Sequence, residues 1–140
     1  MLPSSVRPAH PMSVPRLSAR VHGVLDYAAV IWFAVSPRIF GFGDASTALS
    51  LTVSLVLLLM SVTTAYPLGL LRAIPFNGHL GMDLILSAAL MLSPWFFGFS
   101  PQDPGGPIAL WGGLALLTAT LVTRFETHAS RRESRRLAPV

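Results

Sequence analysis

A repeat of 57 residues is the feature that most restricts how this chain can fold. Most of the repeated residues are polar, small or helix-breaking, so chance alignment of two apolar segments does not explain the match. The residues that recur at this spacing are His22, Asp26, Ser36, Pro37, Phe40, Gly41 and Phe42, which return as His79, Asp83, Ser93, Pro94, Phe97, Gly98 and Phe99. The chain is therefore predicted to be a duplicated unit.

The composition places both copies of this unit in a membrane. Of the 140 residues, 52% are hydrophobic and 11% are charged, which is too little charge to cover a water-soluble globule. A spanning helix needs about 20 mostly apolar residues, and four stretches qualify, at about 21–42, 46–66, 79–99 and 107–124. We therefore predict an all-α fold, a four-helix transmembrane bundle built from two tandem, parallel two-helix repeats. The absence of cysteine excludes disulfides and thiolate metal sites.

The distribution of arginine predicts the orientation and the division of the chain. Arginines precede the first expected span, lie between the second and third and follow the fourth, whereas the other two connections hold only Arg38. Because cytoplasmic loops collect positive charge, both termini are expected in the cytoplasm, and a bacterial host would place the protein in its inner membrane. The expected parts are a disordered cytoplasmic segment 1–19, repeats 20–72 and 73–124, and a basic cytoplasmic tail 125–140.

The basic tail has an expected role of its own. Its clustered arginines would be attracted to an anionic lipid surface, with each contributing about 1 kcal/mol. The residues concerned are Arg131, Arg132, Arg135 and Arg136.

A serine followed by a proline comes late in the first and third expected spans. Proline lacks a backbone N–H and clashes with the preceding turn, so the helices are expected to kink or end at Ser36-Pro37 and Ser93-Pro94. We interpret these motifs as helix terminators. The aromatic residues that follow Pro94, beginning with Trp95, are expected to form a belt at the membrane interface.

The second copy combines a His79-x-x-x-Asp83 pair with Ser93-Pro94-Trp95 in a duplicated two-helix unit. In this it resembles the SPW-repeat family of small integral membrane proteins, over roughly residues 20–124. The first copy departs from the motif, because Arg38 stands at the position of the tryptophan. The resemblance implies a membrane protein of four helices and supplies no established activity.

Each copy places a histidine and an aspartate four positions apart, which puts both side chains on one face of a helix. The proline eleven residues after the aspartate falls on the same face, because eleven residues make almost three turns. An ionisable residue at mid-span costs about 2.5–3.5 kcal/mol, so this face is expected to point into the bundle. Since the repeats are parallel, the two pairs should lie at one depth near the cytoplasmic side.

The four residues His22, Asp26, His79 and Asp83 support two kinds of function, and the sequence leaves both open. In the first, the pairs tie the helices together in a structural or accessory membrane module. In the second, two imidazoles and two carboxylates bind Zn²⁺ or a similar divalent ion or carry protons. The same alternative includes a small hydrophobic cofactor at the repeat interface, either a haem ligated by the histidines or a quinone. The sequence does not identify a cofactor, and it is also compatible with a protein that has none.

An enzyme is not expected, because no nucleophile triad, phosphate loop or pair of catalytic carboxylates is visible in the sequence. The expected partners are the lipid bilayer and either a second copy of the chain or another membrane protein. Nucleic-acid binding is not expected from a short arginine-rich tail without aromatic residues.

Overall fold

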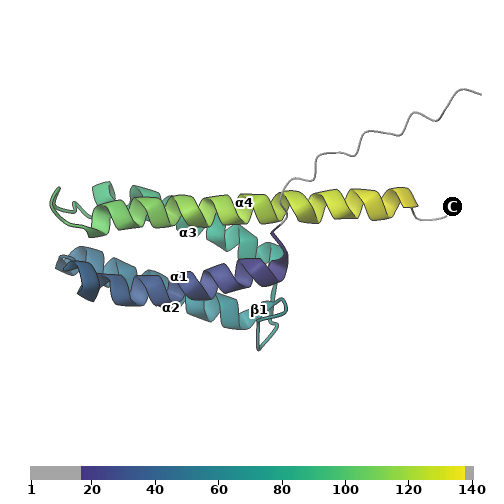
Figure 1. Cartoon of the computed structure of the whole chain (residues 1–140), viewed down its shortest axis with the longest axis horizontal. Helices are drawn as coiled ribbons and strands as arrows, with labels where there is room; N and C mark the ends of the chain where they lie inside the picture. Colours follow the sequence, from purple (N-terminus) through teal and green to yellow (C-terminus); the bar gives the residue numbers. More distant parts are fainter. Residues whose placement is uncertain (1–16, 138–140) are drawn as a thin grey trace, which may run out of the picture.

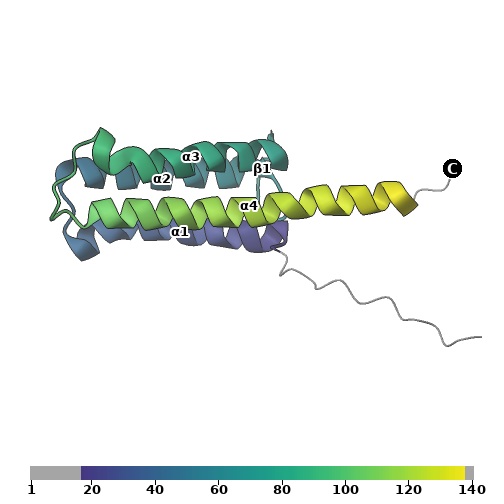
Figure 2. The same ribbon diagram turned by 90° about the horizontal axis from the view of Figure 1, so that it is seen from above.

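The described part of the chain folds into four helices that lie along one axis, with α4 continuing past the other three (Figures 1 and 2). The computed structural model describes residues 17–137, with side chains as far as Thr123. The helices are α1 (Ala19–Phe40), α2 (Asp44–Thr63), α3 (Phe76–Phe96) and α4 (Gly105–Leu137). Two short strands, β1 (Thr64–Ala65) and β2 (Ile74–Pro75), pair in parallel between α2 and α3. The predicted all-α four-helix fold is confirmed.

The distribution of side chains is that of a membrane protein. All four helices are long and apolar enough to cross a bilayer, α4 over Gly105–Thr123. Large apolar residues such as Ile31 and Ile85 are 64% and 65% exposed, while the interior holds histidine, aspartate, serine and threonine. Proteins folded in water bury apolar side chains and rarely bury charged ones, whereas in lipid the ionisable residues turn to the bundle interior. Lipid is therefore the solvent for most of this surface.

Helices α1, α2 and α3 begin and end two or three residues before the spans predicted from hydropathy, whereas α4 begins two residues early and continues past its predicted end to Leu137. At the start of α1 the Ser18 hydroxyl accepts a hydrogen bond from the Val21 N–H, at 3.4 Å. At the opposite end Gly41 has a φ of +66°, and its repeat partner Gly98 has a φ of +59°. Glycine adopts this left-handed conformation without steric cost and commonly ends helices. The caps decide the boundaries, and an average of hydropathy does not detect them.

The first Ser-Pro motif lies inside the last turn of α1, which ends three residues after Pro37. Proline has no N–H for the carbonyl four residues earlier, which here belongs to Phe33. That carbonyl instead accepts a hydrogen bond from the Ser50 hydroxyl of α2, at 2.7 Å. A polar side chain of the neighbouring helix therefore satisfies the backbone group that the proline leaves free, as a membrane interior requires.

The second Ser-Pro motif lies in the last turn of α3, which ends two residues after Pro94. Here the freed carbonyl belongs to Leu90, and the hydroxyl of Ser93 donates to it at 2.7 Å. The next residue, Trp95, is 71% exposed, as an interfacial aromatic residue would be. Ser93 therefore satisfies the backbone carbonyl that Pro94 leaves without a hydrogen-bond donor.

The helices form two hairpins that pack mainly within themselves, α1 against α2 and α3 against α4. The apolar core between the hairpins consists of Phe33, Val53, Leu57, Leu90, Ala109 and Leu116. We call the end formed by the start of α1 and residues 64–75 the proximal end, and the end formed by residues 41–43 and 97–104 the distal end. Both termini of the described chain lie on the proximal side (Figure 1).

The repeat changes its spacing between the first and second helix of each hairpin. Helices α1 and α3 correspond at 57 residues, but the buried face of α2 returns in α4 at 59 residues. Thus Leu57 corresponds to Leu116 and Thr64 to Thr123, and all four side chains are buried. The longer distal connection of the second repeat absorbs the two additional residues.

Candidate metal centre

The four ionisable residues singled out from the sequence meet in one cluster inside the bundle, towards its proximal end. The cluster, which we call the quartet, consists of His22 and Asp26 of α1 with His79 and Asp83 of α3. These side chains are only 0 to 2% exposed. One ligand atom from each lies within 4.8 Å of the ligand atoms of the other three. The expectation that both pairs face inward at a common depth agrees with this arrangement.

Two of the four contacts within the quartet join α1 to α3, and the other two lie within one helix. The Nε2 atom of His22 lies 3.1 Å from Asp83 Oδ2 and 3.6 Å from Asp26 Oδ1. The Nε2 atom of His79 lies 3.1 Å from Asp26 Oδ2 and 3.2 Å from Asp83 Oδ2. Each imidazole therefore lies between two carboxylates, one from each repeat. Helical spacing alone predicts only the contacts between residues four positions apart.

Two threonines complete the site, and the sequence analysis missed them. The Thr64 hydroxyl lies 2.8 Å from Nδ1 of His79, and the Thr123 hydroxyl lies 3.2 Å from Nδ1 of His22. Both threonines are buried, with exposed fractions of 0% and 1%. Since they correspond at the spacing of 59 residues, a search for a second register in the repeat would have paired them.

Aromatic side chains cover the quartet on its proximal side. The ring of Phe76 lies edge-on to His22, with centroids 5.8 Å apart, and stacks on His79 at 6.2 Å. Tyr66 lies beside both Phe76 and His79, at 6.0 and 5.9 Å. Its ring fits against α1 because position 23 is glycine: a Cβ atom on Gly23 would lie 2.1 Å from Tyr66 Cε2. Burial raises the pKa of Tyr66 to about 12, so this side chain is neutral.

The dimensions of the quartet suit a small divalent ion. Zinc bound at about 2.0–2.2 Å by nitrogen and oxygen has tetrahedral ligand atoms about 3.3 Å apart. The four nitrogen-to-oxygen distances, from 3.1 to 3.6 Å, bracket that value, although they involve both oxygens of Asp26. As a set of four, the ligand atoms lie within 4.8 Å of one another, so a bound ion would draw them closer together. Two carboxylates and two neutral imidazoles would also cancel the charge of a divalent ion, which matters because net charge is costly in a low-dielectric interior.

A haem suits the same geometry less well. Two histidines that bind one haem iron need the porphyrin plane between their Nε2 atoms. Here Asp26 and Asp83 contact both Nε2 atoms, so carboxylates occupy the space that the porphyrin would need. The Oδ1 atom of Asp83 has no hydrogen-bond partner among the residues that the structure describes. A buried acceptor atom without a partner on a quartet residue favours a cation over a flat apolar cofactor.

The other residues singled out from the sequence lie away from the quartet. The Ser36-Pro37 and Ser93-Pro94 motifs are about 15 Å further along their helices, at 1.5 Å per residue. The side chains of Arg131, Arg132, Arg135 and Arg136 lie outside the described residues, as does the N-terminal segment up to residue 16.

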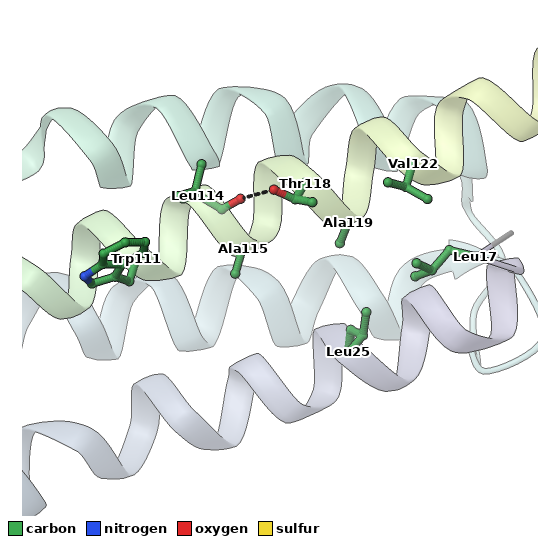
Figure 3. A pocket seen from close by; sticks show the side chains of 8 residues that line it. All are labelled: Leu17, Leu25, Trp111, Leu114, Ala115, Thr118, Ala119 and Val122. Carbon is green, nitrogen blue, oxygen red and sulfur yellow. Dashed lines mark hydrogen bonds between the residues drawn. The ribbon is translucent and has the colours of Figure 1, made fainter. Parts of the chain in front are cut away.

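An apolar groove runs between α1 and α4. Its wider part encloses about 640 Å³, includes Trp32, Trp111 and Leu57 in its lining and reaches Asp26 of the quartet. In the adjoining part, Ala115 and Ala119 of α4 point towards α1, and Leu25 points back towards α4 (Figure 3). This lining is almost wholly apolar, so the groove offers a ligand shape and hydrophobic contact but few polar partners.

Comparison with known proteins gives no relative for this chain. No family model, no curated protein and no solved structure matches it. What the observations do establish is a four-helix membrane protein with a buried His/Asp quartet between α1 and α3.

Proposed function

We propose that this membrane protein binds a divalent transition-metal ion of the zinc class within the quartet. The observation that carries the proposal is the position of each imidazole Nε2 atom between carboxylates of both repeats, at 3.1 to 3.6 Å. A single N–H points along one direction and cannot align well with two acceptors. An ion at the centre of the cluster contacts all four ligands at once. Imidazole nitrogen with carboxylate oxygen is a ligand set that zinc accepts.

A structural tie without metal is the second candidate. Two of the four contacts are 3.1 Å long, within the usual range of a hydrogen bond from nitrogen to oxygen. Both of these contacts join α1 to α3, so they would hold the two hairpins in register. In this function the protein is a structural or accessory module, and the quartet needs no ligand.

Metal titration of the purified protein separates the two candidates. The full chain in detergent or nanodiscs should bind one Zn²⁺, and Co²⁺ in its place should give the intense visible absorption of tetrahedral coordination. Zinc at about one hundred times its dissociation constant should stabilise the folded chain by about 2.7 kcal/mol, and a chelator should reverse the effect. A well-folded wild-type protein that neither binds nor responds to Zn²⁺ or Co²⁺ would leave the structural tie as the function.

Matched substitutions assign the binding to the quartet. The double variant Asp26→Asn/Asp83→Asn keeps the shape of both side chains but removes both charges, and it should lose the zinc response. Asp44→Asn is the control, because Asp44 is an aspartate in the first turn of α2 at the distal end. Zinc binding that survives in the double variant would place the ion elsewhere. If the double variant does not fold, the same comparison with single variants decides.

The family, the location and the partners of the chain belong to the same proposal. The His79-x-x-x-Asp83 and Ser93-Pro94-Trp95 motifs support membership of the SPW-repeat family. The arginine distribution supports an inner-membrane location with both termini in the cytoplasm. The proposed role is binding without catalysis. The bilayer is the immediate partner, and the groove between α1 and α4 is an apolar surface on which a second copy or another membrane protein could pack.

A further inference from the structure

We propose that Thr64 and Thr123 are positioning residues that fix the ring orientation of both histidines, so that Nε2 and not Nδ1 meets the ion. This inference rests on the proposed function. It concerns which imidazole atom binds and what holds the ring, and it adds two residues to the site.

The Thr64 hydroxyl lies between a backbone carbonyl and an imidazole nitrogen, and it can donate to only one of them. A threonine hydroxyl has one proton and two lone pairs. The Thr64 hydroxyl lies 2.5 Å from the carbonyl oxygen of Met60, a group that can only accept, so the hydroxyl proton goes there. Towards Nδ1 of His79, at 2.8 Å, the same oxygen can then only accept. The imidazole therefore carries a proton on Nδ1, and Nε2 is the atom whose lone pair is free to bind an ion when the ring is neutral.

Thr123 repeats the arrangement on the other side of the quartet. Its hydroxyl donates to the carbonyl of Ala119 at 2.8 Å and accepts from Nδ1 of His22 at 3.2 Å. Two independent positions thus give the same proton placement. A lone threonine bonded back to its own helix would be ordinary. Two that both receive an imidazole N–H on the far side of a ligand cluster make a support for that cluster.

The support also crosses between the repeats. Thr64 follows α2 of the first repeat and holds His79 of the second, whereas Thr123 belongs to α4 of the second repeat and holds His22 of the first. Partners on the far side of a ligating imidazole set its tautomer and orientation, and their loss typically lowers metal affinity 10–100-fold. The site is therefore complete only when both hairpins are assembled.

Valine substitution at the two threonines tests the inference, because valine keeps the branched shape and removes the hydroxyl. We expect Thr64→Val and Thr123→Val each to weaken Zn²⁺ binding at least tenfold. Thr118→Val is the matched control: the Thr118 hydroxyl makes the same backbone bond, to Leu114 at 2.8 Å (Figure 3). Thr118 is exposed, however, and has no hydrogen bond to a histidine among the residues that the structure describes. Thr64→Ser and Thr123→Ser keep the hydroxyl and should bind zinc nearly as tightly as wild type.

A spectroscopic readout distinguishes a positioning role from general destabilisation. With isotope-labelled histidine and NMR-active cadmium in the full-length protein, the metal should couple to Nε2 of both imidazoles, and both Nδ1 atoms should carry protons. Coupling to Nδ1 would overturn the inference even if no valine variant folds. Valine variants that bind zinc as tightly as Thr118→Val would overturn it too. If the inference about the threonines fails but the wild-type protein binds zinc, the proposed function still stands. A wild-type protein that binds neither zinc nor cadmium refutes both proposals.

Discussion

His22 lies closer to Asp83, 61 residues further along the chain, than to Asp26 on the next turn of its own helix. The Nε2 atom is 3.1 Å from the first carboxylate and 3.6 Å from the second. The hairpins are held internally by helix packing, and the two 3.1 Å contacts of the quartet run between them. A change at the quartet should therefore affect how the two repeats are joined more than how each repeat folds.

The orientation of the bundle can be tested at the C-terminus. A reporter fused after Val140 should be active only on the cytoplasmic side, because four spans return the chain to the side on which it began and arginine flanks favour that side. Paired reporters that are active on opposite sides of a bacterial inner membrane measure this directly. A reporter that is active only outside would reverse the orientation and place the quartet near the outer face.

The hydroxyl of Ser50 should be coupled to Pro37 in stability. Ser50→Ala leaves the Phe33 carbonyl without its 2.7 Å partner and should lower the free energy of unfolding by about 1–3 kcal/mol. Pro37→Ala restores a backbone N–H for the same carbonyl, so Ser50→Ala should cost less in that background. Unfolding of the four proteins in mixed micelles gives the coupling. Equal costs in both backgrounds would show that the serine does not replace the missing N–H.

Asp103 should contribute stability that acid removes. Its carboxylate accepts hydrogen bonds from the Ser46 hydroxyl at 2.7 Å and from the Gly105 N–H at 2.8 Å. Partial burial opposes ionisation, but these hydrogen bonds outweigh it and hold the pKa of Asp103 below its usual value. A lowered folded-state pKa gives stability that is present above the unfolded pKa of about 3.9 and is lost as the pH falls through the folded value.

The variant Asp103→Asn isolates this contribution. It should lower the free energy of unfolding by roughly 1 kcal/mol at neutral pH, since a capping bond at the start of α4 is weakened. The difference between wild type and variant should shrink below about pH 4. The measurement is unfolding at neutral and acid pH in the same detergent. A difference that stays constant with pH would show that the charge of Asp103 is not involved.

Two glycines should respond to alanine with opposite signs. A Cβ atom on Gly113 of α4 would lie 2.8 Å from the carbonyl oxygen of Ser87 in α3, so Gly113→Ala should force the helices apart and cost about 1–3 kcal/mol. Gly81 has no atom within 4 Å of such a Cβ, and Gly81→Ala should stabilise its helix by about 0.5–1 kcal/mol. Thermal unfolding of both variants measures the contrast. A neutral effect at Gly113 would mean that α3 and α4 are not in close contact there.

The four members of the quartet could be predicted because each step needed only local information. The spacing of His22 and Asp26 fixes one helix face, the repeat supplies the second pair, and the cost of charge in lipid turns both faces inward. Thr64 and Thr123 could not be found in this way. The apolar helices carry many serines and threonines, and no periodicity marks these two. Thr64 and Thr123 are also 59 residues apart, so they do not align at the spacing of 57 residues that relates the two His/Asp pairs.

The helix ends illustrate the same limit on a smaller scale. Hydropathy locates a span to within a turn, but the left-handed backbone at Gly41 and the cap at Ser18 set its last and first residues. The sequence also did not predict which group donates to the Phe33 carbonyl, because the donor, Ser50, belongs to another helix. Proline predicts that a carbonyl is left free, but only packing selects the group that satisfies it.

By itself the sequence determined the solvent, the number of helices and the inward faces of α1 and α3, because composition and helical period act over short stretches of chain. Only the tertiary structure decided that each histidine contacts the aspartate and the threonine of the opposite repeat. Those partners are up to 101 residues apart in the sequence. Their distances depend on how two hairpins pack against each other, and no local spacing encodes that relation.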